Sequence, residues 1–189
     1  MDLDHRLLLA VYGGMHGAWA LPMVALSILG SGWSATTIVP LLAWARTRRF
    51  ALALAAAVVL QSAIVWALKR VVGRVRPWLA LGLAPPFGVP HDGSFPSGHA
   101  AGSFCVAAYL VVSLRLIEWP GSARLRPATS RRAERAGRQA AALALAGIAA
   151  MIALSRVYLG AHFPSDVVAG AVLGGTIGAG AARFGGTRA

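Results

Sequence analysis

Residues 50–72 read FALALAAAVVLQSAIVWALKRVV, an apolar run whose first charges, Lys69 and Arg70, come near its end. A helix of about 20 apolar residues is long enough to cross the hydrocarbon core of a bilayer. Comparable runs occupy residues 100–117, 140–158 and 164–182. The sequence therefore predicts an all-α protein that spans a membrane several times.

The N-terminal third contains two shorter apolar runs, at 18–29 and 34–45, separated by Gly30, Ser31 and Gly32. Two short or tilted helices here would bring the total to about six crossings, whereas a single re-entrant pair is the alternative. We favour six, and expect one polytopic helical bundle forming a single domain over residues 1–189. The first residues, MDLDHR, lack the positively charged start of a cleavable signal peptide, so none is expected.

The composition agrees with a membrane protein, and the charge is distributed accordingly. The chain is 57% hydrophobic and 13% charged, with a formal net charge of +12. Arginines cluster at 46–49, at 115–138 and at 183–188. Loops rich in arginine stay in the cytoplasm, so we place these clusters, including an Arg-rich loop at about 118–138, on the cytoplasmic side. Membrane topology thus explains the charge, and we expect no nucleic-acid partner.

This topology places three polar stretches on the opposite, outer face: Lys69-x6-Arg76-Pro77, Pro96-Ser97-Gly98-His99 and Ser155-Arg156-x5-His162-x3-Asp166. Each stretch borders the end or the start of a predicted span. Cations are unexpected on this face, and long side chains that reach for the interface account for one or two of them. They do not account for five: Lys69, Arg70, Arg74, Arg76 and Arg156.

The second stretch can bind an anion. Ser97 follows Pro96 and can cap the helix that begins there, which leaves free backbone N–H groups near Gly98. A helix start of this kind favours negative charge. A capping serine is common, so the signal becomes specific only with His99 beside it and the cations of the other stretches.

The third stretch pairs His162 with Asp166, four residues apart and so on one face if both lie in a helix. A carboxylate there can hold one imidazole nitrogen and direct the other towards a reacting atom. The plainer interpretation is that Asp166 only complements a helix start. A metal site built from the histidines and aspartates, His91 and Asp92 included, is disfavoured because several cations nearby would repel a divalent ion.

Together the three stretches resemble the signature of the type 2 phosphatidic acid phosphatase (PAP2) superfamily, which includes lipid phosphatases and vanadate-dependent haloperoxidases. Every fixed position of that signature is filled between residues 69 and 166. The resemblance implies that His162 attacks phosphorus with Asp166 orienting it, and that His99 protonates the leaving oxygen. It also implies that no metal or cofactor is needed. The phosphate-binding residues would be Lys69, Arg76, Ser97, Gly98 and Arg156.

We therefore expect a membrane phosphatase that acts on a lipid phosphate or pyrophosphate at the outer face of a bacterial-type inner membrane, through a phosphohistidine. Undecaprenyl pyrophosphate is the first choice of substrate. Phosphatidylglycerophosphate, phosphatidic acid and lipid A are alternatives, because the three stretches identify phosphate rather than the lipid. A haloperoxidase and a non-catalytic lipid-binding scaffold are less favoured. Outside the site, Gly170, Gly174 and Gly178 form a row typical of close helix packing.

Overall fold

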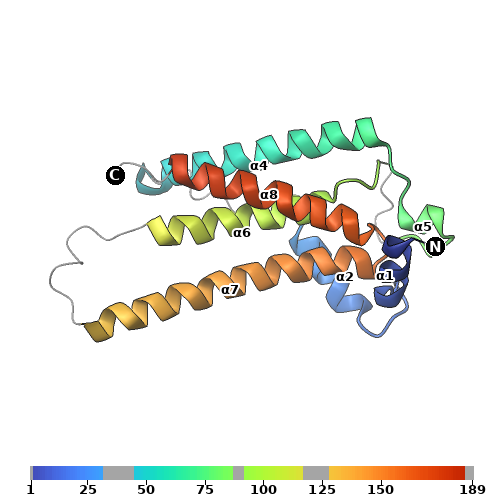
Figure 1. Ribbon diagram of the computed structural model, residues 1–189, viewed down its shortest axis with the longest axis horizontal. Helices are drawn as coiled ribbons and strands as arrows, with labels where there is room; N and C mark the ends of the chain where they lie inside the picture. The colour runs from blue at the N-terminus through green and yellow to red at the C-terminus, as the bar shows by residue number, and fades with distance from the viewer. Residues whose placement is uncertain (1, 32–44, 87–91, 117–127, 186–189) are drawn as a thin grey trace.

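The computed structural model describes residues 2–31, 45–86, 92–116 and 128–185, and within these ranges all regular secondary structure is helical. The long helices α4, α6, α7 and α8 lie side by side along a bundle, with α1 and α5 at one end of it (Figure 1). The predicted all-α fold is confirmed. The helices are α1 (Leu3–Val11), α2 (Ala20–Leu29), α4 (Ala45–Val72), α5 (Pro77–Ala80), α6 (Gly98–Leu116), α7 (Ala128–Tyr158) and α8 (Pro164–Gly185).

The predicted spans correspond to these helices. α4, α7 and α8 are each long and apolar enough to cross a membrane, and they contain the predicted runs at 50–72, 140–158 and 164–182. α6 and α2 are also apolar but shorter, at Gly98–Ser113 and Ala20–Leu29. The predicted helix at 34–45 lies outside the described residues, and with it the total number of crossings.

The predicted Arg-rich loop at 118–138 is wrong over its second half, because α7 already begins at Ala128. Residues 131–140 read RRAERAGRQA, and alanine, arginine, glutamate and glutamine all favour helix. Glu134 and Arg138 add an ion pair at helical spacing, with Oε2 and Nη2 3.9 Å apart. The N-terminal end of α7 therefore extends as a polar helix beyond its apolar span.

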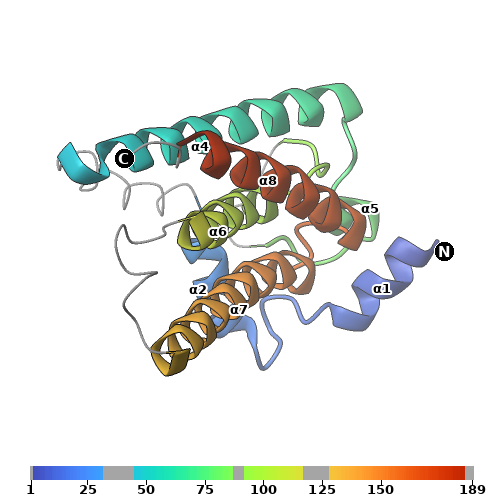
Figure 2. The ribbon, with the colours of Figure 1, turned by 60° about the vertical axis from the view of Figure 1, so that its left-hand side comes forward.

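The glycine row on α8 brings this helix unusually close to α6, as predicted. A Cβ atom at Gly170 would lie 2.4 Å from the carbonyl oxygen of Ser97, and one at Gly174 1.9 Å from that of Ala101. At Gly178 the distance to the Cys105 carbonyl oxygen would be 2.0 Å. Only glycine allows this approach, so the row fixes the position of α8 against α6. Figure 2 shows α8 running between α4 and α6.

This arrangement gathers the ends that carry the predicted site. The end of α4, the start of α6, the end of α7 and the start of α8 all lie at the same end of the bundle (Figure 1). There α1 packs through Leu8, which is fully buried against Val157 and Phe163. The far end is held by a second cluster, in which the Tyr109 hydroxyl donates to the Phe50 carbonyl oxygen at 2.8 Å.

Candidate active site

The structure brings the residues of the three stretches together. Lys69 lies on the last turn of α4 and Arg76 just before α5. Ser97 precedes α6, which begins with Gly98 and His99. Arg156 lies on the last turn of α7, and Asp166 in the first turn of α8. A backbone hydrogen bond from Ser97 N to the Asp166 carbonyl oxygen, 2.9 Å long, ties the starts of α6 and α8 together.

The start of α6 has the expected capped geometry. The Ala100 N–H donates to Ser97 Oγ at 3.5 Å, the bond that a capping serine makes with the third residue of its helix. Ser97 is fully buried, and a Cβ at Gly98 would meet only Val65, at 3.7 Å. The free N–H groups of this first turn therefore point out of the helix end, where an anion can bind.

His162 has one nitrogen fixed and the other directed at a cation. Its Nδ1 is 2.7 Å from the carbonyl oxygen of Ser94, which can only accept, so Nδ1 carries the proton and donates. The Nε2 atom is then the acceptor, and its lone pair accepts from Nη1 of Arg76 at 3.2 Å. This tautomer presents a nucleophilic nitrogen beside a phosphate-binding guanidinium.

The electrostatic surroundings of His162 keep it neutral. Burial is the largest effect, and the positive charges of Arg76, Arg156 and Lys69 act in the same direction. The Asp166 carboxylate opposes them only in part, and the pKa of His162 is lowered to about 4. The imidazole is therefore neutral, with Nε2 unprotonated as a nucleophile requires, throughout the neutral pH range.

Asp166 does not hold His162 in the manner expected from their spacing. Its Oδ2 atom is 3.8 Å from His162 Nδ1, beyond hydrogen-bond distance. The reason is that α8 begins at Pro164, so His162 lies in the preceding turn and the two side chains do not share a helix face. Asp166 Oδ2 accepts instead from the Ser94 hydroxyl and from the Phe163 N–H, the latter at 2.9 Å. Ser94 thus bridges the carboxylate and the imidazole.

Arg74 completes the surroundings of Asp166. Its Nη1 donates to Asp166 Oδ1 at 2.7 Å, and its Nη2 donates to Asp4 Oδ2 at 2.7 Å. Asp4, on α1, also accepts from the backbone N–H of Ser165 at 3.0 Å. The network fastens α1 across the start of α8. Sequence reasoning missed Asp4, Arg74 and Ser94 as site residues, and the only signal was that Arg74 belongs to the excess of cations on this face.

The Lys69 and Arg76 side chains face an aspartate from the loop before α6. Lys69 Nζ is 3.0 Å from Asp92 Oδ2, and Arg76 Nη2 is 2.5 Å from Asp92 Oδ1. Partial burial alone would raise the pKa of Asp92, but the hydrogen bonds from Lys69 and Arg76 lower it to about 2. Asp92 is 54% exposed, and its carboxylate pairs with the two cations at the place where the oxygens of a phosphate are expected to bind.

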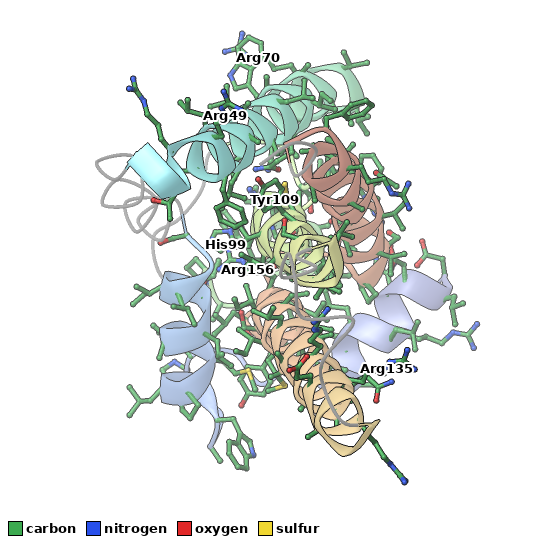
Figure 3. The ribbon with its side chains drawn as sticks, turned by 90° about the vertical axis from the view of Figure 1, so that its left-hand side faces the viewer. Arg49, Arg70, His99, Tyr109, Arg135 and Arg156 are labelled. Atoms are coloured by element: carbon green, nitrogen blue, oxygen red, sulfur yellow. The ribbon has the colours of Figure 1, made fainter. Side chains whose placement is uncertain are left out.

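Arg156 and His99 lie in the interior, between α2, α6 and α7 (Figure 3). Arg156 is 7% exposed, its Nη1 donates to the Ser27 hydroxyl of α2, and its Nε has no partner among the described residues. The end of α2 fits closely over His99, since a Cβ at Gly30 would lie 3.5 Å from His99 Cδ2. A buried guanidinium with an unused donor is suited to binding an anion.

Among the described residues, no group of histidine, cysteine, aspartate and glutamate is arranged to hold a metal ion. His91, considered from the sequence as a possible metal ligand, lies outside the described residues.

Comparison with known proteins identifies the family. The family model of the PAP2 superfamily matches residues 50–189. A decaprenylphosphoryl-5-phosphoribose phosphatase of Mycobacterium tuberculosis is 32% identical over 157 residues, which cover 83% of this chain and 73% of that protein. The phosphatase of the same name from Mycolicibacterium smegmatis is 33% identical over 140 residues, 74% of this chain and 63% of that protein.

Two solved structures share the fold. A transmembrane PAP2-type phosphatidylglycerolphosphate phosphatase of Bacillus subtilis superposes with a TM-score of 0.74 at 22% identity, over 96% of this chain and 83% of that one. LpxE of Aquifex aeolicus superposes with a TM-score of 0.73 at 24% identity, over 97% of this chain and 96% of that one. The resemblance inferred from the three stretches is confirmed, and the chain belongs to the PAP2 superfamily as a membrane lipid phosphatase.

Proposed function

We propose that this protein hydrolyses a phosphate monoester on the headgroup of a polyprenyl lipid, using His162 as the nucleophile. The observation that carries the proposal is the state of His162, whose Nδ1 donates to the Ser94 carbonyl oxygen while the unprotonated Nε2 accepts from Arg76 Nη1 at 3.2 Å, a bond that gives way when Nε2 attacks phosphorus. A nucleophile beside positioned cations is what transfer of a phosphoryl group requires.

The reaction has two steps. His162 Nε2 forms a bond to phosphorus as the bond from phosphorus to the lipid oxygen breaks, and His99 gives its proton to the departing oxygen. The phosphate oxygens bind Arg76, Lys69, Arg156 and the N–H groups at the start of α6. Water then attacks the phosphohistidine, His99 accepts a proton from it, and inorganic phosphate and His162 are released. Asp92 must leave the two cations when phosphate binds.

The relatives supply the class of substrate. The Mycobacterium tuberculosis protein, at 32% identity over 83% of this chain, is named for a decaprenyl lipid that carries a 5-phosphoribose group. A lipid of this kind presents a phosphate monoester on a sugar, and the membrane-embedded site is suited to a substrate whose chain stays in the bilayer. Undecaprenyl pyrophosphate, the choice from the sequence, has no support from the named relatives and becomes the alternative substrate.

We place the site at the outer face of the membrane because the arginine clusters indicate that the opposite end of the bundle faces the cytoplasm. The test uses single cysteines in a Cys105→Ala background, Ala84→Cys at the site end and Ala136→Cys on the polar part of α7, both exposed. A membrane-impermeant maleimide added to intact cells should label Ala84→Cys and not Ala136→Cys. The reverse pattern would place the site in the cytoplasm.

The activity is tested by release of phosphate from lipids in detergent with EDTA present. The lipids are decaprenylphosphoryl-5-phosphoribose, undecaprenyl pyrophosphate, phosphatidic acid and phosphatidylglycerophosphate, and His162→Ala is the control. The highest kcat/KM is expected for the phosphoribose lipid. A preference for undecaprenyl pyrophosphate would restore the first choice from the sequence, and no release from any lipid would refute the proposal.

A further inference from the structure

A cavity of about 440 Å³ lies behind His99, inside the bundle. Residues from α2, α4, α6 and α7 line it, among them Leu29, Val58, Val106 and Ile152. Along α6 it extends from Gly98 to Ala107, which corresponds to roughly 14 Å of helix leading from the site into the bilayer. It therefore joins the reacting centre to the apolar interior.

The cavity lies on the leaving-group side of the reaction. An in-line displacement puts the departing oxygen opposite the nucleophile, and His162 does not line the cavity. His99, the group that protonates this oxygen in the proposed mechanism, lines the cavity. The part of the substrate that leaves must therefore enter the cavity.

One polar side chain in this cavity is not satisfied by the protein. Gln61, on α4, is 4% exposed, and its Nε2 donates to the Ser62 hydroxyl at 2.8 Å. Its Oε1 is buried and has no hydrogen-bond partner among the described residues. Turning the amide over would leave the nitrogen without a partner instead. Either way a buried polar atom is unpaired, which destabilises the fold unless a ligand pairs with it.

Gln61 lies at the depth where the first part of a leaving group would be. A Cβ at Gly102 would be 3.8 Å from Gln61 Nε2, so the amide is about one helical turn below the start of α6. The hydroxyl of Ser103 lies on the same stretch of α6, and both serines, Ser62 and Ser103, line the cavity. Deeper lining residues such as Val106 and Leu145 are apolar.

We infer that Gln61, Ser62 and Ser103, which line this cavity, form a subsite for the hydroxyl groups of a leaving group such as a sugar. The inference rests on the proposed function and adds a specificity-determining residue to it. A hydroxyl both donates and accepts, so it can pair with Gln61 in either orientation of the amide.

One other leaving group fits this cavity less well. A bare prenyl alcohol has no polar group beyond the departing oxygen and would leave Gln61 unpaired.

The test compares decaprenylphosphoryl-5-phosphoribose, whose departing group begins with a sugar, with decaprenyl phosphate, whose departing group is the bare prenyl alcohol. Binding is measured in a His162→Ala background, so turnover is not required, with and without Gln61→Leu. The Kd for the phosphoribose lipid should rise about tenfold relative to the Kd for decaprenyl phosphate, because a buried hydrogen bond to a ligand hydroxyl is lost. Gln139→Leu is the matched control, as Gln139 is the chain's other glutamine and lies exposed on α7.

The unfolding temperature distinguishes a ligand-binding role of Gln61 from a structural role. If Gln61 serves the ligand, Gln61→Leu should unfold at the same or a higher temperature without lipid, since it removes an unpaired buried group. Equal losses of affinity for both lipids, no loss for the phosphoribose lipid, or a markedly lower unfolding temperature would overturn the inference. Failure of the proposed function would be seen in a different measurement: the wild-type protein would bind the phosphoribose lipid but release no phosphate from it.

Discussion

Replacing Gly174 by alanine tests whether the packing of α8 on α6 sets the geometry of the site. The new Cβ would lie 1.9 Å from the Ala101 carbonyl oxygen, and relieving the contact to 3.0 Å requires the two helices to separate by about 1.1 Å. Forcing extra volume into a packed contact costs about 1–3 kcal/mol. For a chain of this length, each 1 kcal/mol lowers the unfolding temperature by about 2–4 °C.

The separation of the two helices would also displace the reacting groups. His99 lies in the first turn of α6, and α8 follows directly on the turn that holds His162. The 2.9 Å bond from Ser97 N to the Asp166 carbonyl oxygen joins the starts of the two helices. A misplacement of about 1 Å can reduce a rate about 10²-fold. We therefore expect Gly174→Ala to lower both the unfolding temperature in detergent and kcat/KM for phosphate release.

The neighbouring glycine gives a matched control for this prediction. A Cβ at Gly175 would meet no atom within 4 Å, although the substitution is the same and lies on the same helix. Gly175→Ala should keep the stability and the activity of the wild type or gain slightly in stability, because alanine favours helix over glycine. Wild-type kinetics and an unchanged unfolding temperature in Gly174→Ala would refute the reasoning.

Three further predictions concern the charges of the site. Arg76→Lys and Arg156→Lys should each reduce kcat by about 10²–10³, measured as phosphate release, because an ammonium cannot replace a guanidinium that contacts two oxygens; either variant working above half the wild-type rate would contradict this. Because kcat/KM needs neutral His162, and its pKa in the free enzyme is about 4, protonation should remove activity only as pH falls through about 4. A His162-dependent acid limb near pH 6 would show that its surroundings have been misread. Asp92→Asn should lower the Ki of inorganic phosphate about two- to fivefold, because it frees two cations and a partly exposed ion pair contributes up to about 1 kcal/mol. An unchanged Ki would mean that Asp92 does not compete with phosphate for these cations.

Much of the fold could be predicted because membrane helices have a strong local signal. The apolar run at 50–72 predicts a membrane-spanning helix, and the glycine row on α8 predicts close helix packing, each from its local sequence alone. The extension of α7 back to Ala128 was missed because charge was taken to indicate a loop, whereas the same arginines also favour helix. α1 was missed because nine residues of mixed composition give little periodic signal.

The site was predictable where it depends on motif and topology, and not where it depends on long-range contacts. Charge counting alone placed the three stretches on one face, and the structure gathers them at one end of the bundle. The bonds of Arg74 to Asp4 and Asp166 join residues 70 and 92 positions apart, which no local pattern reveals. The role of Ser94 depends on a loop that returns to α8, and that path cannot be read from spacing.

The most direct test of the central claim is to identify the residue that carries phosphate during turnover. Purified protein would be mixed with decaprenylphosphoryl-5-phosphoribose labelled at its 5-phosphate, quenched in alkali to preserve a phosphohistidine, digested and mapped by mass spectrometry. We expect the label on the peptide that contains His162, stable to base and lost in acid, and none on His162→Ala protein. Label on another residue, or wild-type turnover by His162→Ala protein, would contradict the proposed mechanism.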